Sequence, residues 1–364
     1  MGKSLNEIAQ EIKNSNKKVQ LIYAFNGGGK TRLSRAFKEL IDIEQDDAEQ
    51  QKRKILYYNA FTEDLFYWRN GSQDDPEPKF KIHPNEFTKW IFEEQGQDTN
   101  VIRIFQHYTN EKLTPKFNQG FSEVTFSYER GHEDAGKNIK ISKGEESNFV
   151  WSVFYSVITQ VTAILNETEK ENRETNQFDS LEYVFIDDPV TSLDDNHLIQ
   201  LAVDLSETIR NSSSNLKFII STHNINFYNI IYNETKQKNG YILNHMEDNT
   251  FELNEVKGDS NKNLSYHLYL KSELQSAVFD NRIKRQHFTY LRNLYEKTAS
   301  FLGYPSWGDL LPGDKDAYYK RISNFTSHST LPDAVIAEPT PQEKATVKLL
   351  LDHLIETYSF WKEE

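Results

Sequence analysis

The first residues suited to chemistry form a glycine-rich loop that ends in a lysine and a hydroxyl. Its members are Asn26, Gly27, Gly28, Gly29, Lys30 and Thr31. Small residues let backbone N–H groups surround phosphates, the lysine supplies charge to the β- and γ-phosphates, and the hydroxyl suits a magnesium ion. Ala24 stands where a complete loop of this kind has its first glycine. The loop predicts binding of a nucleotide with Mg²⁺; the alternative is an ordinary turn before a helix.

Two acidic residues end a run of apolar residues in the middle of the chain. Residues 183–186 are apolar, and Asp187 and Asp188 follow them directly. We expect Asp187, with Thr31, to bind magnesium, and Asp188 to act as a base or to orient water at a γ-phosphate. His223, at the end of a second apolar run, is expected to take part in the hydrolysis. The alternatives are that both acids are solvated turn residues and that the histidine is an ordinary turn residue.

A third motif lies between the glycine loop and the acids. Ser142, Gly144 and Glu145 match the signature loop of ABC-type nucleotide-hydrolysing heads, and the order and spacing of the motifs resemble such a head. The resemblance implies that this loop, with Asp194 in a dimer-contact loop, meets the γ-phosphate held by another head. Nucleotide would then be enclosed in a head-to-tail dimer. ABC heads usually have glutamate where Asp188 stands, which leaves the rate of hydrolysis open.

The sequence says less about the nucleobase. Residues 1–22 contain no aromatic side chain. Many ABC ATPases stack adenine on an aromatic residue upstream of the glycine loop, so the usual stacking residue is missing. This permits a nucleotide other than ATP. The glutamine loop of ABC heads is not placed by the sequence.

Apolar runs and helical spacing indicate the elements that hold these motifs. Strands are expected at residues 19–25, 54–58, 124–128, 183–186 and 218–221, the last two as central parallel strands. Helices are expected at residues 30–40, 148–165 and 197–210, and an edge hairpin within residues 236–254. Residues 258–264 (GDSNKNL) form the expected linker between two domains. After it, helices are expected at residues 268–280, 287–302 and 341–361. The predicted fold is an ABC-type α/β nucleotide-binding domain (residues 1–257) followed by a mainly α-helical domain (residues 258–364).

Composition narrows the class of protein. The 364 residues carry a net charge of −13 and include no cysteine, which excludes disulfides and thiolate chemistry and fits a reducing compartment. No apolar run approaches the roughly 18 residues of a membrane span, and the polar N-terminus lacks a signal-peptide core. We therefore expect a cytoplasmic protein without a membrane partner. Residues 265–330 carry nine Lys or Arg against six acids, so phosphate could be handled there.

Three residues in the C-terminal third are candidates for a second chemistry. Arg292 and Glu296 lie four apart on an expected helix, and His328 follows in the segment NFTSHST. By themselves the first two are an ordinary surface pair, worth about 0.3–0.5 kcal/mol, and His328 is a loop histidine.

A resemblance to a known family gives these residues another meaning. The chain resembles the PrrC family of bacterial anticodon nucleases nearly from end to end, and three C-terminal blocks carry the most specific likeness: LRNLYEKTASFLGYP, NFTSHST and AEPTPQEKATVKLLLDH. The resemblance implies cleavage of tRNA-Lys 5′ of the wobble base by a triad that falls on Arg292, Glu296 and His328. It also places an aspartate that reads the modified wobble base at Asp259.

The same resemblance implies a regulated enzyme. Nucleases of this family are held silent by a type I DNA restriction–modification complex and released by a phage-encoded peptide, with GTP hydrolysis and dTTP binding at the heads. They act as a suicide defence, or toxin, that stops translation during phage infection.

The implied reaction suits these residue types. The family leaves a 2′,3′-cyclic phosphate, so the substrate's own 2′-hydroxyl is the nucleophile and no metal is required. Glu296 and His328 can divide the roles of base and acid, with Glu296 assigned here as the base, and Arg292 can bind the phosphoryl oxygens. Tyr290, Tyr295 and Tyr304 are candidates for stacking on splayed bases, with core packing as the alternative.

Two other functions remain open at this stage. The chain could be a DNA-sensing or DNA-repair ABC ATPase with a non-nucleolytic C-terminal binding module, although residues 32–141 lack the heptads of the coiled-coil arms found in such heads. It could also be an interaction protein without nuclease activity. Loss of tRNA cleavage in Arg292→Ala or His328→Ala, with hydrolysis of nucleotide retained, distinguishes the nuclease from both.

Overall fold

The computed structural model describes most of the chain in two compact units. Described are residues 2–43, 53–59, 66–69, 78–83, 86–128, 138–190, 195–246, 248–257, 266–326 and 339–360. The units are Met1–Gly258 and Asp259–Glu364, so their division falls within the expected linker, residues 258–264. Three predicted site residues, Asp194, Asp259 and His328, lie outside the described residues.

A six-stranded sheet forms the centre of the first unit, in the order β10-β9-β1-β8-β7-β2. Its strands are β1 (Val19–Tyr23), β2 (Ile55–Tyr58), β7 (Tyr183–Asp187), β8 (Lys217–Thr222), β9 (Asn239–His245) and β10 (Phe251–Lys257). Strands β2, β7, β8, β1 and β9 run parallel, and β10 pairs antiparallel with β9 as the expected edge hairpin. Every residue of β1 and β7 is buried, as expected for parallel strands covered on both faces.

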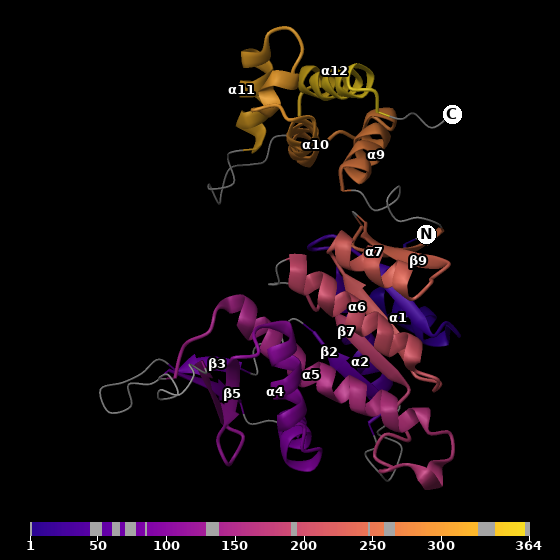
Figure 1. Ribbon diagram of the computed structural model, residues 1–364. Helices are drawn as coiled ribbons and strands as arrows, with labels where there is room; N and C mark the ends of the chain where they lie inside the picture. Colours follow the sequence, from indigo (N-terminus) through magenta and orange to yellow (C-terminus); the bar gives the residue numbers. More distant parts are fainter. Residues whose placement is uncertain are drawn as a thin grey trace. The chain divides into compact units, whose positions relative to one another are not determined.

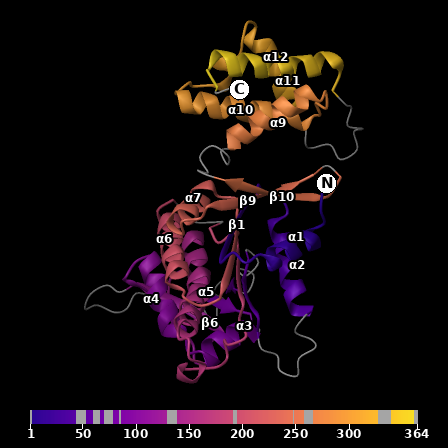
Figure 2. The same ribbon diagram turned by 90° about the vertical axis from the view of Figure 1, so that its right-hand side faces the viewer.

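Helices cover both faces of this sheet (Figure 2). On one face lie α1 (Leu5–Asn14) and α2 (Lys30–Ile43), which share a core with the sheet. On the other face lie α5 (Lys143–Asn166), α6 (Asp195–Asn211) and α7 (Ile225–Glu234). Helices α2, α5 and α6 were expected, whereas α1 and α7 were not.

Helix α5 is long and apolar enough, by length and composition, to cross a membrane. This differs from the expectation that no segment comes close to a span. However, 83% of its most apolar window is buried inside the first unit. Its apolar residues therefore form part of the core of the first unit.

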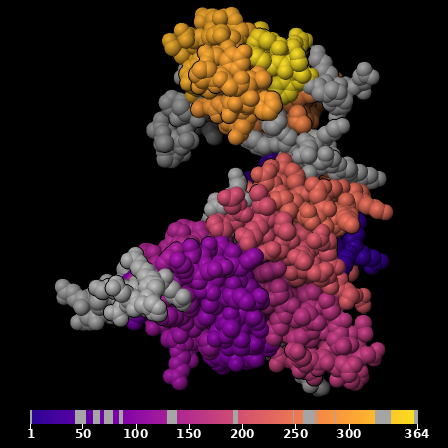
Figure 3. All heavy atoms as spheres, viewed as in Figure 1, coloured from indigo at the N-terminus to yellow at the C-terminus, as the bar shows by residue number. Residues whose placement is uncertain are grey.

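The side lobe is a four-stranded sheet with short helices, inserted between β2 and α5 (Figure 1). The strand order is β3-β4-β6-β5, with β3 (Phe66–Arg69), β4 (Lys79–Ile82), β5 (Leu113–Phe117) and β6 (Glu123–Tyr128) all antiparallel. The helices are α3 (Glu86–Lys89), the π-helix η2 (Trp90–Glu94) and α4 (Asp98–Tyr108). Phenylalanines of this sheet contact Phe149 of α5, and the atoms of the lobe, in purple, lie directly against those of the later part of the first unit, in magenta (Figure 3).

The second unit is helical throughout its described residues. It consists of α9 (Tyr266–Phe279), α10 (Gln286–Leu302), the 3₁₀ helix η4 (Trp307–Leu310), α11 (Lys315–Thr326) and α12 (Pro341–Thr357). Leucines of α9, α10 and α12 form its core with Trp307 and Ile322. Helix α10 ends at Gly303, whose φ of 78° suits the left-handed position after a helix. The predicted helices are confirmed here, and α11 is an additional one.

Candidate functional site: a phosphate loop and a buried acidic pair

The glycine loop joins β1 to α2 through a backbone that its glycines permit. Gly27 and Gly29 have φ angles of 79° and 95°, a region that disfavours residues with a Cβ. The amide of Gly28 donates to the carbonyl of Phe25 at 2.9 Å, which closes a tight turn before Lys30 begins the helix. The loop therefore has a backbone that suits phosphate binding, and Ala24 is accommodated in the core with no exposed surface.

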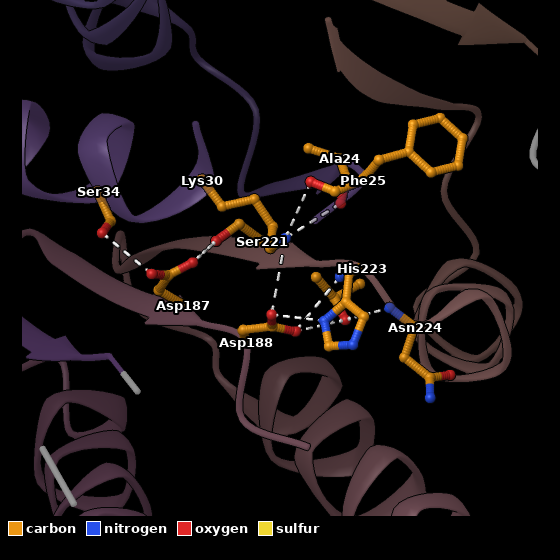
Figure 4. Close-up of polar contacts among 10 residues, drawn as sticks. Ala24, Phe25, Lys30, Ser34, Asp187, Asp188, Ser221, His223 and Asn224 are labelled. Atoms are coloured by element: carbon orange, nitrogen blue, oxygen red, sulfur yellow. Dashed lines mark hydrogen bonds and ion pairs between the residues drawn. The ribbon is translucent and has the colours of Figure 1, made fainter. Parts of the chain in front are cut away.

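Lys30 is held at the centre of the site. Its side chain is 7% exposed, and its Nζ donates to the carbonyls of Ala24 at 3.2 Å and Phe25 at 3.4 Å. The same Nζ lies 3.7 Å from Oδ2 of Asp188, as Figure 4 shows. The lysine at the start of α2 and the acid after β7 therefore face one space, as the sequence predicted.

Asp188 and His223 form a hydrogen-bonded pair beside this lysine. Nδ1 of His223 lies 2.6 Å from Oδ2 of Asp188, and the hydroxyl of Thr222 and the amide of His223 donate to Oδ1 at 3.2 and 3.3 Å. Burial acts to raise the pKa of Asp188, but the hydrogen bond and charge of His223 and the charge of Lys30 outweigh it and hold this pKa below its usual value. The carboxylate is thus kept ionised and oriented.

The backbone supports this orientation. Asp188 has a φ of 56°, an uncommon angle for a residue with a side chain, and its amide donates to the carbonyl of Ser221 at 2.8 Å. Only 8% of Asp188 is exposed. The alternative that Asp187 and Asp188 are solvated turn residues is therefore wrong, since both are buried. His223 lies in the bend after β8 and is hydrogen-bonded to Asp188.

Asp187 is fully buried at the end of β7. Ser221 donates to its Oδ1 at 2.5 Å and Ser34 to its Oδ2 at 3.3 Å. Burial raises the pKa of Asp187, and hydrogen bonds from the hydroxyls of Ser221 and Thr31 partly oppose this effect. Among the described residues no cluster of three or more His, Cys, Asp or Glu could hold a metal. Oxygen ligands from Asp187 and Thr31 nevertheless fit Mg²⁺, which is usually held by one or two carboxylates together with the phosphates of its nucleotide.

The hydroxyl groups behind Asp187 were not predicted from the sequence. Besides Asp187, Ser34 contacts the hydroxyl of Tyr57 at 2.9 Å, and the side-chain amide of Asn59 donates to that hydroxyl at 2.8 Å. Burial raises the pKa of Tyr57, so its proton stays in place. Ser34 follows Lys30 by four residues and so shares its helix face, a signal that was available; the contact with β2 was not.

The signature residues Ser142, Gly144 and Glu145 lie at the start of α5, away from the glycine loop. Ser142 caps α5: its hydroxyl accepts from the amide of Glu145 at 3.3 Å, and the carboxylate of Glu145 accepts from the amide of Ser142 at 2.7 Å. Gly144 lies in the first turn between them. The indole of Trp68, on β3, donates to Glu146. These residues are therefore on the side-lobe end of α5, and their described hydrogen bonds do not join them to the glycine loop.

In the second unit, Nε of Arg292 donates to Oε1 of Glu296 at 2.7 Å, one turn along α10. Their side chains are 36% and 39% exposed, so the pair faces solvent. The structure therefore brings two of the three predicted nuclease residues together, while His328 lies outside the described residues. Tyr295 is fully buried and donates to the carbonyl of Leu350 at 2.8 Å. The candidate role of Tyr295 in base stacking is therefore wrong.

The other two tyrosines differ in accessibility. Tyr290 packs against the helical core, whereas Tyr304 is 44% exposed. Of the three candidates, Tyr304 is the one best placed to contact a base.

The arrangement of the first unit defines a class of protein. The glycine loop, the buried acidic pair and a histidine meet at the carboxyl edge of one parallel sheet. Strand β8, which leads to His223, lies between β1, which leads to the glycine loop, and β7, which leads to the acidic pair. This arrangement is the α/β fold of an ABC-type P-loop head, and a mainly α-helical unit follows it, as the sequence predicted.

Comparison with known proteins identifies the family. No family model matches the chain. The chain is 57% identical, over 392 aligned residues, to the anticodon nuclease of Escherichia coli, with 100% of this chain and 99% of that protein covered. The chain therefore belongs to the family of anticodon nucleases, of the PrrC type.

Solved structures are similar only at a low level. An SMC head bound to the C-terminal winged-helix domain of ScpA is 12% identical, with a TM-score of 0.35, covering 67% of this chain and 91% of that one. The SMC head domain of Thermotoga maritima is 12% identical, with a TM-score of 0.34, covering 67% and 92%.

Proposed function

We propose that this protein is a nucleotide-regulated ribonuclease that cleaves tRNA-Lys in the anticodon loop, 5′ of the wobble base. Similarity to an anticodon nuclease over the whole chain supports a tRNA substrate. The Arg292–Glu296 pair is the observation that carries the proposal. It presents a carboxylate and a guanidinium together on the solvent side of α10, where an RNA phosphate can approach them.

The proposed reaction is a metal-independent transesterification. The 2′-oxygen of the nucleotide before the wobble base attacks the adjacent phosphorus, and the bond from phosphorus to the 5′-oxygen breaks. Glu296 takes the proton of the 2′-hydroxyl, and His328 gives a proton to the departing 5′-oxygen. Arg292 stabilises the charge on the phosphoryl oxygens. The products carry a 2′,3′-cyclic phosphate and a 5′-hydroxyl, and Asp259 contacts the modified wobble base.

The head is proposed to license this cleavage by binding and hydrolysing GTP or ATP. Lys30 and the loop amides hold the phosphates, Thr31 and Asp187 hold Mg²⁺, and Asp188, oriented by His223, acts on the attacking water. Ser142, Gly144, Glu145 and Asp194 would complete the site of a second head in a head-to-tail dimer. The position of the signature residues, away from the glycine loop, is compatible with a site completed by another copy.

Regulation and setting follow from the family resemblance. We propose that dTTP is a regulatory nucleotide, that a type I restriction–modification complex silences the enzyme, and that a phage peptide releases it. The activated enzyme would block translation in the cytoplasm as an anti-phage toxin.

The experiment incubates total tRNA with the purified protein and with GTP, ATP or dTTP, and maps the ends of any fragments. We expect tRNA-Lys fragments that end 5′ of the wobble base, and their loss in Arg292→Ala, Glu296→Gln and His328→Ala. Lys348→Ala is a matched control, because Lys348 forms an exposed i,i+4 pair with Asp352 at 3.0 Å on α12 of the same unit. Cleavage by Arg292→Ala at the wild-type rate would show that the Arg292–Glu296 pair is not part of the active site.

A further inference from the structure

The sheet order indicates on which side of the glycine loop a nucleobase would lie. Strand β1, which leads into the loop, has β8 and then β7 on one side, with Asp188 and His223, and β9 and β10 on the other. A terminal phosphate at Lys30 faces the acidic side. The remainder of a nucleotide held in this loop therefore extends toward β9, whose carboxyl end lies at the same edge of the sheet because β9 runs parallel to β1.

An aromatic ring from β10 lies against the loop on that side. A Cβ placed on Gly29 would come within 2.7 Å of Cε1 of Phe251, so the ring contacts the loop at a distance that only glycine permits. Phe251 is held there by two backbone hydrogen bonds with Lys3, each of 2.8 Å. This bridge fixes the ring beside the loop.

Two exposed polar side chains extend this ring to the surface. The ring of His245, the last residue of β9, stacks on Phe251 with centroids 4.7 Å apart and planes 22° apart. The guanidinium of Arg32 lies 5.1 Å from the centroid of Phe251. His245 and Arg32 are exposed while Phe251 is 4% exposed, so the stack presents His245 and Arg32 at the rim of the phosphate loop.

We propose that the stack of His245 on Phe251, flanked by Arg32, is the platform for the nucleobase of the bound nucleoside triphosphate. This rests on the nucleotide binding proposed above. His245 and Phe251, which lie near the C-terminal end of the first unit, supply the aromatic surface that residues 1–22 lack. Stacking tolerates any base because every base has a π-face, so the platform accepts purine and pyrimidine nucleotides.

The test compares ligands with and without a base on the full-length protein. Dissociation constants are measured for Mg²⁺-GTP, Mg²⁺-ATP and Mg²⁺-tripolyphosphate. In His245→Ala, both nucleotides should bind about tenfold or more weakly, with tripolyphosphate unchanged, and His245→Phe should restore nucleotide affinity. His83→Ala is the matched control, because His83 is another exposed histidine whose ring lies against an aromatic ring, with its centroid 4.3 Å from that of Tyr67 and the two planes 31° apart. It should leave all three dissociation constants unchanged.

Two results would overturn the platform while leaving the phosphate loop intact. One is nucleotide affinity in His245→Ala equal to that of the wild type; the other is an equal loss of affinity for nucleotides and tripolyphosphate, which would assign His245 to the loop's structure. If the wild type binds none of the three ligands more tightly than Lys30→Ala does, nucleotide binding by the head fails, and the platform fails with it.

Discussion

Replacing Asp188 by asparagine separates hydrolysis of the nucleotide from its binding. Asparagine keeps the shape of the side chain and can still accept through Oδ1, but it cannot take a proton from water. Loss of a general base costs about 10²–10⁴-fold in rate. We therefore expect hydrolysis by Asp188→Asn to fall by about two orders of magnitude or more.

The same substitution should not weaken nucleotide binding. Lys30 Nζ lies 3.7 Å from Asp188, and two unit charges at such a distance attract by about 4 kcal/mol at an effective dielectric constant of about 20, much of it offset by the cost of burying both groups. Removing the negative charge leaves Lys30 more available to the phosphates. Affinity should therefore stay the same or rise.

Phosphate release at saturating nucleotide and a binding titration measure the two quantities separately. Asp42→Asn is the control, since Asp42 is an exposed acid that pairs with Lys38 farther along α2. Hydrolysis by Asp188→Asn within about threefold of the wild-type rate would refute the assignment of the base. A loss of nucleotide affinity would refute the electrostatic argument.

Two further substitutions test an ion pair of the second unit and the glycine loop of the first. Glu273→Gln should lower the free energy of unfolding by about 1–3 kcal/mol at pH 7, because Glu273 accepts from Arg282 at 3.0 Å and faces buried His287 at 3.8 Å. His287 and then Arg282 lower the pKa of Glu273 against the effect of burial. The stabilisation is therefore present above the unfolded-state pKa of about 4.3 and is lost as pH falls through the folded-state pKa. In urea unfolding at pH 7 and pH 3.5, the difference in free energy of unfolding between Glu273→Gln and wild type should shrink at the lower pH, and an unchanged difference would contradict the reasoning. Gly29→Ala should abolish nucleotide binding in a titration, because it places a Cβ at a φ of 95° and 2.7 Å from Phe251; wild-type affinity would show that the loop is not held in this conformation.

The sequence was sufficient for the parts of the fold that are locally encoded. Strands β7 and β8 are continuous apolar runs and were predicted. The meeting of Lys30 with Asp188 was also predicted, and the carboxyl ends of all the parallel strands of one sheet lie at the same edge. Helix α11 was missed, since Ile322 is the fully buried apolar residue among its described positions and it leaves little helical pattern. The missed strands β3, β4 and β5 are short and lie in the side lobe.

Contacts between segments far apart in the chain could not be predicted from the sequence. Tyr57 reaches Ser34 from β2, and Phe251 reaches Gly29 from the last strand of the head; neither pair has a local signal. Tyr295 is different, because Leu291, Leu294 and Tyr295 follow the spacing of one helix face and together predict the core position that Tyr295 occupies.

The central claim is that the enzyme cleaves RNA through the substrate's own 2′-hydroxyl, and one modified substrate tests it most directly. Two tRNA-Lys molecules are compared, one entirely ribose and one with a 2′-deoxy sugar at the nucleotide immediately 5′ of the wobble base. The account predicts that the first yields fragments with a 2′,3′-cyclic phosphate and a 5′-hydroxyl, and that the second stays intact at that bond. Cleavage of the deoxy-substituted bond at the wild-type rate would contradict it.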